Sequence, residues 1–194
     1  MAAQISVKQY RMSVKEYLNM LLTHYKKYWK YYSIPVVGLL LIQTVIRIDI
    51  NYTDSLPNSA FITVKGWKSG LKAGDYVAYR YPSDDPVSLF RKGDHMVKII
   101  GGVGGDIVKR DDAGNYTILR SNDSDAFKQL GGYNVGFPKP FSKSGRPLIP
   151  SELGLIPEGK YYVFAPHKDS LDSRYAVVGL IGEDAFIGRT FPIF

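Results

Sequence analysis

Residues 96–108 read Met96-Val97-Lys98-Ile99-Ile100-Gly101-Gly102-Val103-Gly104-Gly105-Asp106-Ile107-Val108. Two apolar, largely β-branched runs flank a glycine-rich turn, a pattern typical of consecutive β-strands. Similar short runs recur between turn sequences throughout the region after residue 50, at 60–64, 76–81, 96–100, 106–109, 116–119, 161–165, 176–181 and 186–187. No long stretch there has a helical period. We therefore expect residues 49–194 to form a mainly β domain, a twisted sheet or irregular barrel, with a loop-rich insertion at about 121–156.

The positive charge of the chain is concentrated near its N-terminus. The formal net charge is +7, and residues 1–30 hold six Lys and Arg against one Glu. The remainder is nearly neutral, which argues against a nucleic-acid-binding domain. The chain contains no Cys, and no three candidate metal ligands have a recognisable spacing. We therefore expect neither a disulfide framework nor a metal site.

One uncharged apolar run, YYSIPVVGLLLIQTVI at residues 31–46, precedes the β region. It is shorter than the ~20 residues that usually span a bilayer, but Lys30 and Arg47 can extend it by snorkelling. Lysines and aromatic residues before the run favour a cytoplasmic N-terminus. We expect a basic, amphipathic cytoplasmic arm at 1–30, a transmembrane anchor at 31–48 and an extracytoplasmic domain at 49–194. A buried core helix and a cleaved secretory signal are the alternatives.

A serine and a lysine are the candidate catalytic residues. Ser55 follows the apolar run closely, and Lys98 shares its strand face with Met96 and Ile100. A serine hydroxyl needs a base to become a good nucleophile. Burial in an apolar wall lowers a lysine pKa by about 3–5 and leaves a useful fraction of the amine neutral. The alternative is that Lys98 points to solvent from a sheet with one buried face.

Histidine is the more usual base, and two histidines lie in the β region. His95 follows Lys92-Gly93-Asp94, and His167 precedes Lys168-Asp169. Either could be oriented by its neighbouring aspartate in a triad. Their charged, loop-like surroundings favour solvated surface residues, so Lys98 is the preferred base.

Four sequence blocks, in order, carry a resemblance to a known family. They are Asn51-Tyr52-Thr53-Asp54-Ser55-Leu56-Pro57, Gly74-Asp75-Tyr76-Val77, the stretch 96–108 quoted above, and Lys168-Asp169-Ser170-Leu171-Asp172-Ser173-Arg174-Tyr175. Together they resemble the type I signal peptidases, most closely the conjugative-transfer (TraF-type) branch, over residues 33–194. Ile99 stands where the family usually has Arg, and Gly104 where it has Pro. The residues after the Ser55 block also differ from the family pattern.

The resemblance implies a signal-peptidase-like β domain behind one transmembrane helix, and it assigns roles to individual residues. Ser55 would be the acylating nucleophile and Lys98 the general base. Thr53 and the Ser55 backbone N–H would form the oxyanion hole. Ser170 would orient the lysine amine, and Asp172 with Arg174 would brace the site by an ion pair. No cofactor is implied.

The same resemblance implies a location and partners. The protein would be a single-pass protein of the bacterial inner membrane, with its catalytic domain in the periplasm. Its substrate would be a precursor protein, above all the propilin of a conjugative transfer or type IV secretion system. In some members the pilin is cyclised. Other secretion-apparatus proteins would be further partners, and nucleic acid would not.

Three alternatives remain at this level. The first is a housekeeping signal peptidase that cleaves many exported proteins. The second is a Ser/Lys autoprotease like the SOS repressors, although the apolar run occupies the place of their DNA-binding helices. The third is a non-catalytic, membrane-anchored β domain of a secretion apparatus.

Overall fold

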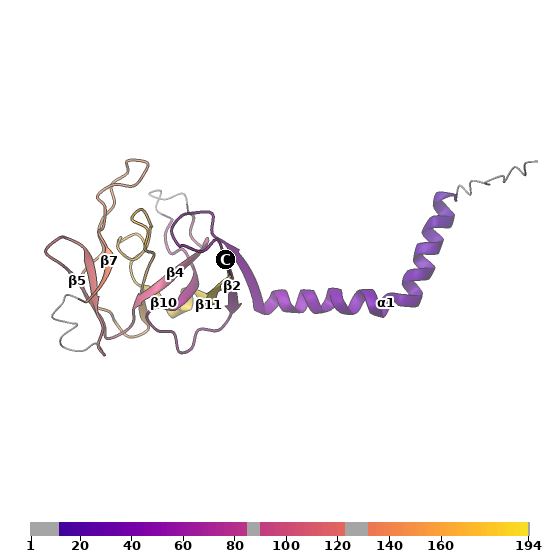
Figure 1. The fold of residues 1–194 in the computed structure, drawn as a ribbon, viewed down its shortest axis with the longest axis horizontal. Helices are drawn as coiled ribbons and strands as arrows, with labels where there is room; N and C mark the ends of the chain where they lie inside the picture. The colour runs from indigo at the N-terminus through magenta and orange to yellow at the C-terminus, as the bar shows by residue number, and fades with distance from the viewer. Residues whose placement is uncertain (1–11, 85–89, 123–131, 194) are drawn as a thin grey trace, which may run out of the picture. The chain divides into compact units, whose positions relative to one another are not determined.

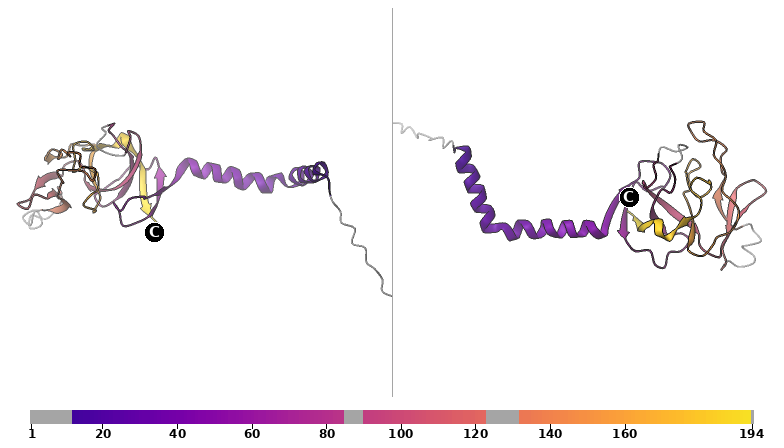
Figure 2. Two further views of the ribbon diagram at one scale, coloured as in Figure 1. Left: turned by 90° about the horizontal axis from the view of Figure 1, so that it is seen from above. Right: turned by 180° about the vertical axis from the view of Figure 1, so that it is seen from behind.

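The computed structural model describes residues 12–84, 90–122 and 132–193. It divides into two compact units, Met1–Thr44 and Val45–Phe194. The first unit contains one helix and the second contains the strands, as Figures 1 and 2 show. The part of the expected arm before residue 12, and residues 123–131 of the expected insertion, lie outside the described residues.

The N-terminal unit is built on α1, Val14–Val45. Its start is fixed by a capping box. The Ser13 hydroxyl accepts a hydrogen bond from the Glu16 backbone N–H (3.2 Å), and the Glu16 carboxylate accepts one from the Ser13 N–H (2.9 Å). None of its described side chains is buried. In the described part of the chain, no helix combines the length and the apolar character that crossing a bilayer requires.

The larger sheet of the second unit has seven strands, all antiparallel to their neighbours. Their spatial order is β1-β2-β11-β3-β4-β9-β10. The strands are β1 Ile46–Ile50, β2 Ala60–Lys65, β3 Tyr76–Arg80, β4 His95–Gly102, β9 Lys160–Phe164, β10 Ile181–Gly182 and β11 Phe186–Pro192. A short 3-10 helix, Glu183–Ala185, connects the last two. Strand β4 lies between β3 and β9, so it is an interior strand of this sheet.

A second, four-stranded antiparallel sheet completes the unit in the order β7-β6-β5-β8. Its strands are β5 Ile107–Arg110, β6 Tyr116–Leu119, β7 Tyr133–Gly136 and β8 Gly154–Leu155. Buried side chains from this sheet, including Val108 and Ile118, pack against Tyr162 and Phe164 of β9. The expected mainly β architecture is therefore confirmed as two antiparallel sheets that share a core.

Several element boundaries differ from those expected. Residues 46–48, assigned to the apolar anchor, lie in β1, where Ile48 pairs with Ile62. Residues 176–180 form no strand, because the N–H groups of Val178 and Gly179 both bond to the Tyr175 carbonyl and turn the chain. The loop-rich insertion contributes β7 and β8 to the second sheet.

The last strand is longer than expected and is fixed by one glycine. A side chain at Gly188 would place its Cβ 1.9 Å from the Val64 carbonyl oxygen, so only glycine allows β11 to approach β2 this closely. The pairing of β11 with β3 also shifts register between Phe186 and Gly188. This strand joins β2 to β3 and so ties the first two strands to the rest of the sheet.

Candidate active site

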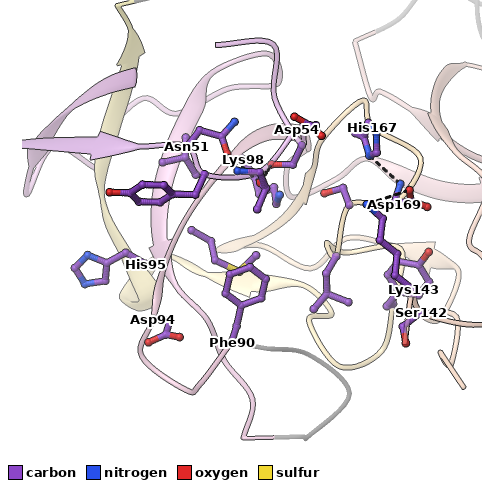
Figure 3. A pocket seen from close by; sticks show the side chains of 18 of the residues that line it. Asn51, Asp54, Phe90, Asp94, His95, Lys98, Ser142, Lys143, His167 and Asp169 are labelled. Atoms are coloured by element: carbon purple, nitrogen blue, oxygen red, sulfur yellow. Dashed lines mark hydrogen bonds and ion pairs between the residues drawn. The ribbon is translucent and has the colours of Figure 1, made fainter. Parts of the chain in front are cut away.

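Segments from the start, the middle and the later part of the β domain, up to Tyr175, line one open cavity of about 1210 Å³. On one side lie the end of β1, the Ser55 loop and the start of β4. On the other side lie residues from 139–148 and from 167–171 (Figure 3). The volume exceeds that of a typical small-molecule site. A cavity of this size can hold a segment of polypeptide.

The Ser55 loop is shaped by the side chain of Asn51, for which no role was predicted from the sequence. Asn51 Oδ1 accepts hydrogen bonds from the Thr53 N–H (3.1 Å) and the Thr53 hydroxyl (2.9 Å). Asn51 Nδ2 donates to the carbonyls of Leu56 (3.2 Å) and Asn58 (3.1 Å). Asparagine commonly forms such a turn with the backbone two residues on. The sequence signal for this role was the position of Asn51 at the start of the Ser55 block.

Thr53 is the hydrogen-bond partner of the candidate nucleophile. The two oxygens, Thr53 Oγ1 and Ser55 Oγ, lie 2.9 Å apart. The Thr53 hydroxyl has one proton. When it donates that proton to Asn51, the Ser55 hydroxyl donates to Thr53. When it donates instead to Ser55 Oγ, the Ser55 proton is free to be taken by a base.

Lys98 occupies the buried face of β4 with Met96 and Ile100, as its alternation predicted. Its side chain is only 3% exposed. Burial lowers the pKa of Lys98 to about 8, because the charged amine loses its hydration; the nearby charge of Asp172 opposes this fall, and Arg174 adds to it. Lys98 and Ser55 line the same cavity. No hydrogen bond joins these two described side chains.

Asp172 and Arg174 form a buried ion pair rather than a surface one. Arg174 Nε donates to Asp172 Oδ1 (2.8 Å) and Nη2 to Oδ2 (2.7 Å), and the side chains are 1% and 0% exposed. Burial alone would lower the pKa of Arg174, but hydrogen bonds to Asp172 and its charge raise it above the ordinary value.

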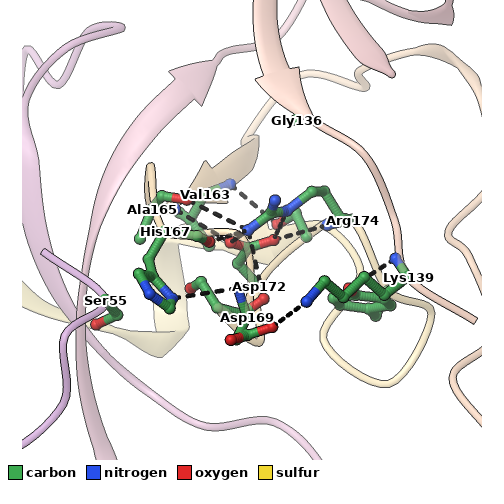
Figure 4. Close-up of polar contacts among 12 residues, drawn as sticks. Ser55, Gly136, Lys139, Val163, Ala165, His167, Asp169, Asp172 and Arg174 are labelled. Carbon is green, nitrogen blue, oxygen red and sulfur yellow. Dashed lines mark hydrogen bonds and ion pairs between the residues drawn. The ribbon is translucent and has the colours of Figure 1, made fainter. Parts of the chain in front are cut away.

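The pair also fixes the loop before it (Figure 4). Arg174 Nη2 lies within hydrogen-bond distance of the carbonyls of Ala165, His167 and Ser170, and the Asp172 carboxylate accepts the Ala165 N–H (3.1 Å). Ser170 Oγ is buried on this loop and, in the part of the chain that the structure describes, has no hydrogen-bond partner. Its residue lines the same cavity as Lys98.

The two histidines differ in environment. His95 is exposed at the start of β4, where partial burial, and secondarily the charge of Arg47, lower its pKa. His167 is half-buried, lines the cavity and accepts a hydrogen bond at Nδ1 from the Asp169 N–H (3.2 Å). Asp169 in turn pairs with Lys139. Over the described ranges, no group of three His, Cys, Asp or Glu residues could hold a metal ion.

Comparison with known proteins identifies the family. A model of the family described as signal peptidase, peptidase S26, matches residues 31–194. No curated protein matches this chain. A crystal structure of a signal peptidase I from Enterococcus faecalis V583 is similar, with 21% sequence identity and a TM-score of 0.37, over 62% of this chain and 97% of that one. Since the family model spans most of the sequence, including the whole β domain, this protein belongs to the peptidase S26 family of signal peptidases.

Proposed function

We propose that the protein is a serine endopeptidase that removes signal or leader peptides, with Ser55 as the nucleophile and Lys98 as the general base. The observation that carries the proposal is that Ser55 and a buried lysine of lowered pKa line one cavity large enough for a polypeptide segment. Strongly shifted pKa values in a cleft are typical of catalytic groups. Membership of the signal peptidase family supplies the reaction class.

The proposed reaction begins with neutral Lys98. With a pKa of about 8, roughly one lysine in ten is neutral at pH 7. Lys98 Nζ takes the Ser55 proton as Ser55 Oγ attacks the scissile carbonyl. In this scheme the bound precursor excludes water from the cavity, and Nζ and Oγ come within hydrogen-bond distance in that complex. Such hydrogen bonds are often long before substrate binds. The Ser55 N–H donates a hydrogen bond to the oxyanion, and the Thr53 hydroxyl turns its single proton from Ser55 Oγ to the oxyanion as well.

The tetrahedral adduct then breaks its C–N bond, and the proton on Nζ passes to the leaving amine. The Ser55 ester is attacked by water, whose proton passes to Lys98 Nζ. As the C–Oγ bond breaks, that proton moves from Nζ to Ser55 Oγ, which releases the acid and restores the hydroxyl and the neutral amine. In this scheme the buried Ser170 hydroxyl, which has no hydrogen-bond partner in the described structure, holds the Lys98 amine. The Asp172–Arg174 pair keeps the Ser170 loop in place.

We also propose that the chain is tethered to the bacterial inner membrane with its N-terminus in the cytoplasm and the β domain in the periplasm. The uncharged residues 31–46 and the basic residues before them support this arrangement. Large apolar side chains are exposed along the corresponding part of α1, among them Ile34, Leu40 and Ile42.

The proposed substrate is a propilin of a conjugative transfer or type IV secretion system. Support comes from the Ser55 block and the 168–175 block, which resemble the conjugative branch of the family. In that setting an amine of the same pilin can replace water in the second step and cyclise the product. The partners would then be the propilin, the bilayer and other secretion-apparatus proteins.

The test is processing of a precursor by Ser55→Ala and Lys98→Ala variants of the full chain. Both should leave the precursor uncut while remaining folded, whereas Ser69→Ala and Lys109→Ala, at exposed positions outside the cavity, should cut normally. In the wild type, kcat/KM should rise with pH and level off above about 8, since neutral Lys98 is the active form. Normal processing by either dyad variant would refute the proposal.

A further inference from the structure

Residues 137–151 follow β7 and form a hairpin (Figure 1). This hairpin is called the arm from here on, and it is distinct from the cytoplasmic arm expected at 1–30. Its two sides pair at Phe141 and Pro147, and the Ser142 N–H bonds to the Arg146 carbonyl (2.9 Å). The base is fastened to the segment after Asp172. The Lys139 N–H donates to the Tyr175 hydroxyl (3.0 Å), and the Ser151 N–H donates to the Arg174 carbonyl (2.9 Å). The arm is therefore a positioned wall of the cavity.

The charge of the arm is all of one sign. Residues 137–151 contain Lys139, Lys143 and Arg146 and no carboxylate up to Ser151, and all three cations line the cavity. Asp169 on the facing loop pairs with Lys139, and its other oxygen lies 3.6 Å from Lys143 Nζ. The Asp169 carboxylate thus forms ion pairs with two ammonium groups. The Lys143 side chain is 76% exposed.

The opposite side of the cavity carries carboxylates. Asp54 lies in the Ser55 loop and Asp94 just before β4, and Figure 3 shows both across the cavity from Lys143 and Asp169. On this side the three carboxylates of Asp49, Asp54 and Asp94 outnumber the cations of Arg47 and Lys98. The charge therefore changes from net positive at the arm to net negative at the β1 and β4 side. A peptide lying between these walls experiences different charges on its two sides.

We propose that the arm is a specificity element that selects precursors carrying an acidic side chain where the bound segment passes Lys143. This inference rests on the proposed peptidase function and adds a substrate feature to it. An aspartate or glutamate of the precursor would take the position at Lys143 Nζ that Asp169 fills only at 3.6 Å. A basic side chain at that position would be repelled, and electrostatic complementarity would thereby fix which way the segment lies.

The experiment uses the full-length enzyme and internally quenched peptides with alanine one and three residues before the scissile bond. A single Glu is moved through four positions on each side of that bond, and each peptide has a matched Gln version. At one position or two neighbouring ones, Glu should raise kcat/KM over Gln by about 1.5- to fivefold, the range for exposed ion pairs, mainly through KM. The gain should fall as NaCl is raised.

Variants locate the effect on the arm. Lys143→Ala should bring the Glu:Gln ratio close to one, and Lys143→Glu should favour a Lys peptide at the same position. Asp169→Asn removes the competing carboxylate and should increase the ratio. Lys109→Ala, an exposed lysine on β5 outside the cavity, should leave it unchanged. Because each ratio is taken within one variant, a general loss of activity cancels.

The outcomes separate this inference from the proposed function. If no peptide is cut by wild-type enzyme, the peptidase function itself is in error. If the peptides are cut but Glu and Gln versions are equal at every position, or Lys143→Ala keeps the full preference, the arm does not select charge. A preference that survives high salt unchanged would also overturn the electrostatic explanation.

Discussion

Replacing Lys98 by Met should make the β domain more stable at neutral pH, although it removes the proposed base. Met has a similar length and no charge to bury, and the site already packs Lys98 between Met96 and Ile100 on the same face of β4. In the wild type, burial lowers the Lys98 pKa from 10.5 to about 8. The folded state therefore holds a protonated amine at a cost at pH 7.

The size of the effect follows from that difference. Each pKa unit corresponds to about 1.36 kcal/mol, so 10.5 against about 8 gives a penalty of about 3 kcal/mol at pH 7. Between pH 8 and 10.5 the unfolded chain binds the proton that the folded protein has released, so wild-type stability rises with pH across this window. The stability advantage of Lys98→Met should therefore shrink by about 2.5 kcal/mol between pH 7 and pH 10.

The assay is urea unfolding of the full chain at pH 7 and pH 10. The chain has two tryptophans, and in a Trp29→Phe background the fluorescence of Trp67 reports on the β domain, where its ring packs against Phe191. Contributions from groups that titrate in both proteins cancel when the free energies of unfolding of wild type and variant are subtracted. Lys109→Met, at an exposed position on β5, is the matched control for the loss of a lysine. A Lys98→Met difference independent of pH would refute the assignment of a buried amine with a lowered pKa.

Two further predictions concern the supports of the site. Asp172→Asn leaves the Arg174 guanidinium buried without its carboxylate and should lower the free energy of unfolding by about 3–5 kcal/mol; a loss below 1 kcal/mol in chemical denaturation would contradict the importance of this pair. Asn51→Ala removes the four hydrogen bonds that shape the Ser55 loop. It should reduce kcat about tenfold or more through misplacement of Ser55 while the protein still folds, and an unchanged kcat would show that the loop holds its shape without Asn51.

Local patterns in the sequence predicted the strands around the site well. The alternation of Met96, Lys98 and Ile100 identified a buried lysine because a strand interior to the sheet repeats its exposure every two residues. The Ser55 loop was found from its position and motif. The cytoplasmic arm expected at 1–30 and the anchor expected at 31–48 both contribute to one helix in the structure, α1 from Val14 to Val45.

What local patterns missed depends on contacts between distant segments. β1 was missed because residues 46–48 were assigned to the anchor, although its sequence IRIDI alternates apolar and charged residues as a strand does. Its pairing with Ala60–Lys65 is a contact between separate segments. Nothing in the sequence around Asp172 and Arg174 indicates that their ion pair is buried. Its burial results from the folding of the 165–175 loop around the two side chains. The pairing of Lys139 with Asp169 across thirty residues is likewise a product of the tertiary structure.

The base of the arm has a consequence for how this protein could diversify. Both ends of the hairpin are clamped to the strip Arg174–Ala176, through the Tyr175 hydroxyl and backbone hydrogen bonds that include Ala176 N–H to the Ile149 carbonyl (2.9 Å). Those clamps do not involve the tip, where Gly145 forms the turn with a φ of +77° and no neighbouring atom lies within 4 Å of the position of a Cβ. The residues of the tip can therefore be replaced, by evolution or by grafting, while the residues of the candidate active site keep their geometry.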